Sequence, residues 1–103
     1  MPSNPPLDAE AQRSFDDPSR SVFCLSLRSR AEIGLMARVV QALARRSLLP
    51  SRWHSVEAGE QLLMDLQIPE ISMEEGELLA VALGQIVGVE EVLTSRFLRL
   101  SPA

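Results

Sequence analysis

The order of hydrophobic patterns along residues 21–100 limits this chain to very few folds. Alternation with a period of two residues indicates strands, and apolar residues spaced three or four apart indicate helices. We expect six elements in the order strand, helix, strand, strand, helix, strand, over residues 21–28, 34–48, 52–58, 60–68, 73–87 and 89–100. This order predicts an α+β domain with the split βαβ plan, in which two helices cover one face of a four-stranded antiparallel sheet.

The strand patterns also predict which side chains face the core. In the first strand, Phe23, Leu25 and Leu27 share one face, while the other face is mixed in character. The clearest strand of the middle hairpin, after the turn near Ala58 and Gly59, places four apolar residues on one face: Leu62, Met64, Leu66 and Ile68. Its partner at 52–58 is more polar, which favours a position at the edge of the sheet.

Each helix pattern has an apolar stripe and recognisable ends. In the first helix, the predicted stripe contains Leu35, Val39 and Leu43. Either Ala42 or Arg46 completes it, and Met36 and Val40 widen it. In the second helix, Ser72 and Glu75 form a capping-box pattern. Its predicted stripe holds Leu79, Ala82, Leu83, Ile86 and Val87, and Gly88 would stop the helix.

Composition excludes several classes of protein. The 103 residues provide one core, and a hydrophobic content of 46% is ordinary for a globular protein. The net charge of −4 argues against nucleic-acid binding. No apolar run is long enough to span a membrane. A single cysteine suits a reducing compartment, so we expect the cytoplasm. We predict that residues 1–20, which are rich in proline, form a flexible tail and that residues 21–103 form the domain.

No catalytic or metal-binding constellation is visible in the sequence. His54 is the only histidine, so a surface position is the simpler interpretation. Cys24 lacks a basic partner and is interpreted as a buried structural thiol. Trp53 is predicted to pack at an edge-strand contact of a dimer.

Two groups of charged residues are also candidates for a site. The first group, Glu74, Glu75 and Glu77, is interpreted as helix-capping residues. The second group, Arg28, Arg30 and Arg38, is interpreted either as an anion site or as a solvated charge fringe. We therefore expect no catalytic residue, metal or cofactor.

The segment Ile33-Gly-Leu-Met-Ala-Arg-Val39, which follows the first strand, resembles the loop-to-helix signature of the ACT domain family. The segments 44–46 and 83–89 extend the resemblance, which is closest to the short regulatory small subunits of acetolactate synthase. Over residues 21–100 the resemblance implies a ferredoxin-like βαββαβ fold. A residue without Cβ at Gly34 would let a ligand approach the start of the helix closely.

The resemblance also implies a function. The chain would be a non-catalytic regulatory subunit that forms a homodimer and controls a thiamine-diphosphate-dependent acetolactate synthase in response to a branched-chain amino acid. Carried over by position, the ligand-binding residues would be Ala31, Glu32, Ile33, Gly34, Leu35 and Met36.

Two other functions remain open from the sequence. The chain could be a stand-alone dimeric interaction module without a small-molecule ligand; this is favoured by Ala31, which occupies a position where the family often has Asn or Asp. A small ferredoxin-like enzyme acting in a dimeric barrel is the third function. Such an enzyme needs a pocket lined by polar side chains, and this chain has only one histidine and no tyrosine to form it.

Overall fold

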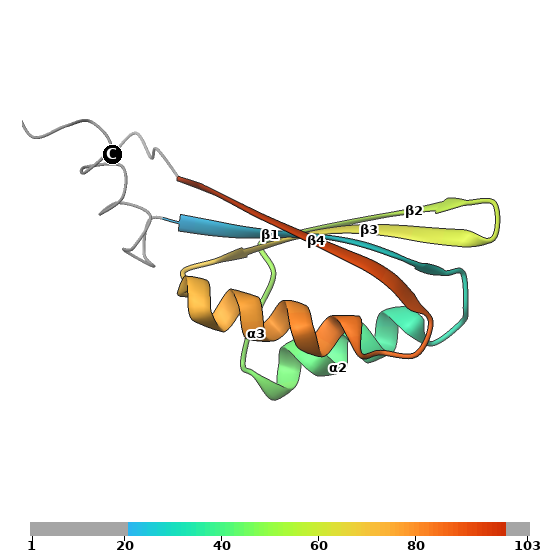
Figure 1. Ribbon diagram of the computed structural model, residues 1–103, viewed down its shortest axis with the longest axis horizontal. Coiled ribbons are helices and arrows are strands. Elements are labelled where there is room, and N and C mark those ends of the chain that lie inside the picture. Colours follow the sequence, from blue (N-terminus) through green and yellow to red (C-terminus); the bar gives the residue numbers. More distant parts are fainter. Residues whose placement is uncertain (1–20, 99–103) are drawn as a thin grey trace, which may run out of the picture.

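The computed structural model describes residues 21–98, which form a four-stranded sheet covered on one face by two helices (Figure 1). The elements are β1 (Ser21–Arg30), α2 (Leu35–Arg45), β2 (Arg52–Ala58), β3 (Gln61–Pro69), α3 (Met73–Gly84) and β4 (Val89–Leu98). Their order confirms the predicted βαββαβ plan. The predicted tail at 1–20 and the last residues of the predicted closing strand lie outside the described residues.

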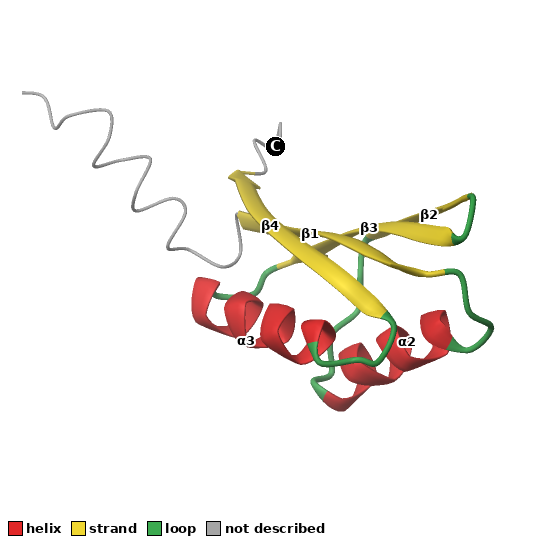
Figure 2. Cartoon of the chain, turned by 45° about the vertical axis from the view of Figure 1, so that its right-hand side comes forward, coloured by secondary structure: helices red, strands yellow, loops and turns green. Residues whose placement is uncertain are grey.

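The strands lie in the order β2-β3-β1-β4, and each neighbouring pair is antiparallel. β1 and β3 are therefore central, while β2 and β4 form the two edges. The prediction of an edge position for β2 is confirmed. Both helices lie on the same side of the sheet, so the opposite face is left open (Figure 2). This arrangement places the end of β1, the β2–β3 turn and the start of β4 at one end of the molecule.

The core lies between the helices and the sheet, and it is almost entirely aliphatic. The predicted inward residues Phe23, Leu25 and Leu27 of β1 are all buried. The four predicted apolar residues of β3 are buried beside them. Trp53 also lies on this side and packs against the core from β2, where its Nε1–H donates to Ser55 Oγ at 2.6 Å. Trp53 is thus half-buried against the core of its own domain, and its predicted contact in a dimer stays a prediction.

The buried stripe of α2 is narrower than predicted. Leu35, Val39, Ala42 and Leu43 are buried, but Met36 and Val40 remain 42% and 51% exposed. Successive helical residues are rotated by about 100°, so these two side chains lie on a flank that the sheet does not reach. Of the two alternatives at the end of the stripe, Ala42 is buried and Arg46 is exposed.

α2 ends three residues earlier than predicted, because the chain turns at Ser47. This residue has a φ of +55°. The N–H of Ser47 donates to Ala44 O and that of Leu48 donates to Leu43 O, both at 3.0 Å. These two bonds form a Schellman motif, which normally has glycine at the left-handed position.

The beginning of α3 agrees with the sequence, but its end does not. The Glu75 N–H donates to Ser72 Oγ at 3.1 Å, as the capping pattern predicts. The helix ends at Gly84, before the predicted Val87, which is 77% exposed. The last turn is lost because the chain must bend into β4, and Gly88 makes that bend with a φ of +103°.

Candidate functional site

The strongest candidate site is the corner where β1 ends and α2 begins. Gly34 is the N-cap of α2, with a φ of +95° and a ψ of −9°. A Cβ added at this position would meet no atom within 4 Å. Glycine is therefore required here by the left-handed backbone conformation, while the space in front of it is open to a ligand or partner.

Two neighbouring loops hold this corner through backbone hydrogen bonds. The Ala31 N–H donates to Glu60 O in the β2–β3 turn at 2.9 Å. The Arg30 N–H donates to Gly88 O in the α3–β4 loop, also at 2.9 Å. A displacement of the corner would therefore also move the two loops that lead into β3 and β4, because these hydrogen bonds connect them to it.

The six residues carried over from the family resemblance differ in their accessibility. Ile33 is fully exposed and Met36 is 42% exposed, so both could contact a ligand. Ala31, Glu32 and Gly34 are also exposed. Leu35 is only 1% exposed and belongs to the core. Leu35 could therefore take part only by holding the helix start in position.

The start of α2 has no side-chain cap, and of its first N–H groups that of Leu35 donates to Glu32 O at 3.2 Å. Gly34 provides no side chain to cap the helix, and the first turn contains no acidic residue. The N–H groups of the first turn are consequently not capped by a side chain, and the helix dipole adds a partial positive charge there. Such an end can accept a carboxylate.

A cavity of about 590 Å³ adjoins this corner. It is lined by Arg30, Ala31, Glu32, Glu57, Gly59, Glu60, Gln61 and Glu90. Four carboxylates and one guanidinium give it a strongly negative character. Arg30 Nη1 lies 3.8 Å from Glu32 Oε1, and Gln61 Nε2 donates to Glu90 Oε1 at 3.3 Å. The corner thus combines a helix end that favours an anion with a cavity that favours a cation.

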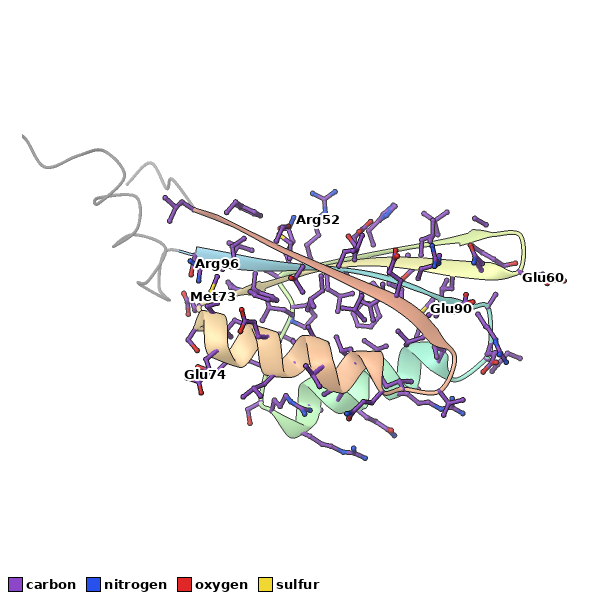
Figure 3. All side chains as sticks on the ribbon, in the orientation of Figure 1. Arg52, Glu60, Met73, Glu74, Glu90 and Arg96 are labelled. Atoms are coloured by element: carbon purple, nitrogen blue, oxygen red, sulfur yellow. The ribbon has the colours of Figure 1, made fainter. Side chains whose placement is uncertain are left out.

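The acidic lining of this cavity was not predicted from the sequence, because its residues come from distant segments. Glu60 and Glu90 are far apart in the chain but lie at the same end of the sheet (Figure 3). They meet there because β1 pairs with both β3 and β4. Gly88 was identified only as a helix stop, yet a Cβ on it would lie 3.2 Å from Leu35 Cδ1. One feature of the sequence does indicate the acidic lining: glutamates flank the predicted turn at residues 58–59, and another follows Gly88.

The three arginines expected near Gly34 have separate roles. Arg28 lies on the open face of the sheet, with its Nη1 3.7 Å from Glu91 Oε1. Arg30 pairs with Glu32, as described above. Arg38 Nη1 donates to Val87 O at 3.3 Å, so this side chain ties α2 to the α3–β4 loop. Only Arg30 lines the acidic cavity.

A second hollow, of about 620 Å³, lies between the two helices. Its lining includes Arg38, Arg45 and Arg46 from α2 and its end, and Ala82 and Gln85 from α3 and its end. Arg46 Nη1 donates to Ala42 O at 2.9 Å. We refer to this hollow as the interhelical groove. Its three guanidinium groups outnumber its one carboxylate, that of Glu32, so the groove is basic, in contrast to the cavity at the corner.

Cys24 and His54 lie on the open face of the sheet, where they line a shallow hollow with Asp65. Cys24 is partly buried, and burial raises the pKa of its thiol; a hydrogen bond with Ser95 opposes this rise, and the charge of Asp65 adds to it. A raised pKa makes the thiol a weak nucleophile at neutral pH. Within residues 21–98, no three histidine, cysteine or acidic side chains are grouped so that they could hold a metal ion.

Solved structures share this architecture. The ACT domain from GTP pyrophosphokinase of Chlorobium tepidum has a TM-score of 0.64 at 11% identity, over 72% of this chain and 96% of that domain. This chain has an ACT-type fold. The C-terminal domain of the MgtC protein from Mycobacterium tuberculosis also has a TM-score of 0.64, at 15% identity, over 84% of this chain and 97% of that domain.

A further similar structure is the regulatory subunit of aspartate kinase from Thermus thermophilus, with a TM-score of 0.60 and 17% identity. The likeness covers 75% of this chain and 51% of that subunit. No protein-family model and no curated protein matches the sequence. In the described part of the chain, neither helix has the length and apolar character needed to cross a membrane.

Proposed function

We propose that this chain is a non-catalytic regulatory domain that binds a free amino acid at the corner between β1 and α2. The observation that carries the proposal is the uncapped start of α2 at Gly34 beside a cavity lined by carboxylates. A zwitterionic amino acid has one group for each: its carboxylate for the helix N–H groups and its ammonium for the cavity. The ACT-type fold supports this choice of ligand.

The side chain of the amino acid would meet apolar surface. Ile33 is fully exposed beside Gly34, and Met36 is the next exposed apolar residue along α2. An aliphatic side chain would remove part of both from water. This supports a branched-chain amino acid, of which valine is the first to test.

The corner is connected to the rest of the domain in a way that suits regulation. A ligand held between Gly34 and Glu60 would favour one position of the β2–β3 turn, because Ala31 is hydrogen-bonded to that turn. The bond between Arg30 and Gly88 would transmit the change to the start of β4. A ligand that prefers one such arrangement shifts the population toward it, and a partner protein can respond.

We further propose that the domain works as a homodimer and that its partner is the catalytic subunit of a thiamine-diphosphate-dependent acetolactate synthase. The support for this partner is the Gly34–Val39 segment and its resemblance to the small subunits of that enzyme. We place the complex in the cytoplasm, and this rests on the single cysteine.

Calorimetric titration of the full chain with valine, leucine and isoleucine tests the amino-acid site. N-acetylvaline lacks the ammonium group and valinamide lacks the carboxylate, so each removes one of the two proposed contacts. We expect binding by at least one branched-chain amino acid, weaker binding of both derivatives, and weaker binding by Glu60→Gln. Equal binding of valine and its derivatives, or no binding of any amino acid, would disprove the site.

The proposed partner needs its own test. The tagged chain is mixed with purified acetolactate synthase catalytic subunit from the same source, and co-elution and enzyme activity are measured with and without valine. We expect a stoichiometric complex whose activity responds to valine. Failure to co-elute would remove this partner while leaving the amino-acid site unaffected.

The alternative is a stand-alone dimeric interaction module that binds no small molecule. Ala31 favours it, because this exposed position offers no polar side chain to a ligand. The negative cavity favours it too, since its carboxylates repel the carboxylate of an amino acid. Dimer formation without any amino-acid binding in the titration would support this alternative.

A further inference from the structure

The two helices lie antiparallel, side by side, on the surface of the domain (Figure 1). The interhelical groove brings Arg38, near the start of α2, together with Gln85, just after the end of α3. At the opposite end, a smaller hollow brings Arg46, just after α2, together with Glu75 in the first turn of α3. The beginning of each helix is therefore level with the end of the other.

The outer side of α3 is apolar. Leu79 and Leu83 face the core, but Leu78 and Val81 on the outer side are each 60% exposed. A helix that is apolar on both sides is normally covered on both sides. On α2 the residues opposite the buried stripe are small or polar and exposed, namely Ala37, Gln41 and Ala44. Small side chains on one helix let a second helix with larger side chains approach closely.

The charges of the two helices are complementary. α2 contains Arg38 and Arg45 and no acidic residue, whereas α3 contains three glutamates and no basic residue. Glu74 lies in the first turn of α3, on the side away from the sheet (Figure 3). Arg45 and Glu74 take part in neither of the ion pairs found within residues 21–98. Charges of opposite sign are thus available on adjacent helices.

We propose that a second copy of this chain docks on the helical face, with α2 of each copy lying over α3 of the other. A two-fold axis that runs along the interhelical groove produces this arrangement, because it exchanges the two helices between the copies. Ala44 of one copy then faces Leu78 of its partner, and Gln41 faces Val81.

The same two-fold axis also decides which charged residues of the two copies lie opposite each other. Since the end of α2 is level with the beginning of α3, Arg45 of one copy comes to lie over Glu74 of the other. Two-fold symmetry gives the dimer two such pairs. The basic groove and the apolar outer side of α3 are both covered in this arrangement. The inference deepens the dimer named under the proposed function and rests on that dimer, but it does not depend on the amino-acid site.

Sedimentation velocity of the full chain over a series of concentrations tests the proposal through a charge swap. Arg45→Glu and Glu74→Arg each place like charges together twice per dimer, so each should raise the dimer dissociation constant by about tenfold or more. The double variant, with both charges exchanged, should return to within about threefold of the original value. Arg52→Glu, on the open face of the sheet, is the matched control and should leave the constant unchanged.

If the double variant dimerises again, the single variants had lost a contact between the copies and not their fold. A misfolded variant would not be repaired by a second charge reversal. A dimer that is insensitive to all these variants would overturn the helical interface and leave the proposed function standing. A chain that is monomeric at every concentration would overturn both the interface and the dimer part of the proposed function. Binding of inorganic phosphate in the groove of such a monomer would assign the arginines to an anion instead.

Discussion

Three residues show how a single backbone conformation defines the ends of the elements here. Gly34, Ser47 and Gly88 all have a positive φ; the first two lie at the two ends of α2, and Gly88 lies directly before β4. Glycine adopts such values without a steric penalty, whereas other residues do so at a cost. Two of the three positions therefore hold glycine, the residue that a positive φ favours, and Ser47 is the exception.

Gly34→Val should destabilise the domain by about 1–3 kcal/mol, because a β-branched residue is strained at a φ of +95°. Since a Cβ meets no atom there, the loss is conformational and not steric. Gly34→Asn is the matched control, because asparagine tolerates the left-handed region, and it should lose clearly less. Urea unfolding measures both variants. Equal losses would contradict this account.

Ser47→Gly should stabilise the domain by about 0.5–1 kcal/mol. Glycine removes the strain of the left-handed conformation, and the two hydrogen bonds that end α2 involve only the backbone. The gain is reduced by the greater freedom of glycine in the unfolded chain. An increase in the urea midpoint with an unchanged slope would confirm the prediction, and a lower midpoint would contradict it.

Cys24 gives a prediction for pH dependence. Burial raises the pKa of the folded thiol above the ordinary value of 9.0, so folding favours the protonated form. The stability from this group is therefore complete below pH 9.0 and is lost as pH rises through the folded pKa. At mildly alkaline pH, iodoacetamide should react more slowly with the native chain than with the urea-unfolded chain. Similar rates in both states would contradict the raised pKa.

At the scale of an element, α2 shows what periodicity can and cannot predict. Its spacing correctly identified Leu35, Val39 and Leu43 as buried. It assigned Met36 and Val40 to the same stripe, because apolar character alone does not show how much of a helix the sheet will cover. The width of a buried stripe is set by the neighbouring elements, and these come from distant parts of the sequence.

Leu43→Ala should destabilise the domain by about 2–5 kcal/mol, because Leu43 is 2% exposed in the core and its removal leaves a cavity. Val40→Ala is the matched comparison on the same helix and should be almost neutral in the isolated domain, since Val40 is 51% exposed. Circular dichroism during urea unfolding measures the two. A large loss for Val40→Ala would show that its flank of the helix is covered in solution.

At the scale of the whole molecule, the domain has one thin core and two faces that remain open. The helical face contains Leu78 and Val81, and the opposite face of the sheet contains Leu93 and Phe97, all exposed. Apolar surface of this kind, surrounded by charged residues, marks interaction sites. Which apolar side chains remain exposed is thus decided by the arrangement of layers and not by any one element.

If the helical face holds a second copy, the stability of the domain must depend on concentration. Association with the folded state alone stabilises it by mass action, so the melting temperature should rise as the chain concentration increases. Arg45→Glu should largely remove this rise, because it weakens the dimer without removing a core contact. Differential scanning calorimetry at several concentrations measures the effect. A melting temperature independent of concentration would mean that the native chain is monomeric under these conditions.

The sequence by itself determined the order of elements, the inward faces of β1 and β3 and the cap at Ser72. These depend on local spacing and backbone sterics, which are written within a few neighbouring residues. Only the tertiary structure decided that Glu60 and Glu90 line one cavity with Arg30, that Trp53 packs against the core, and that basic α2 lies beside acidic α3. These features depend on strand pairing and layer packing, which join segments that are distant in the sequence, and no local pattern encodes them.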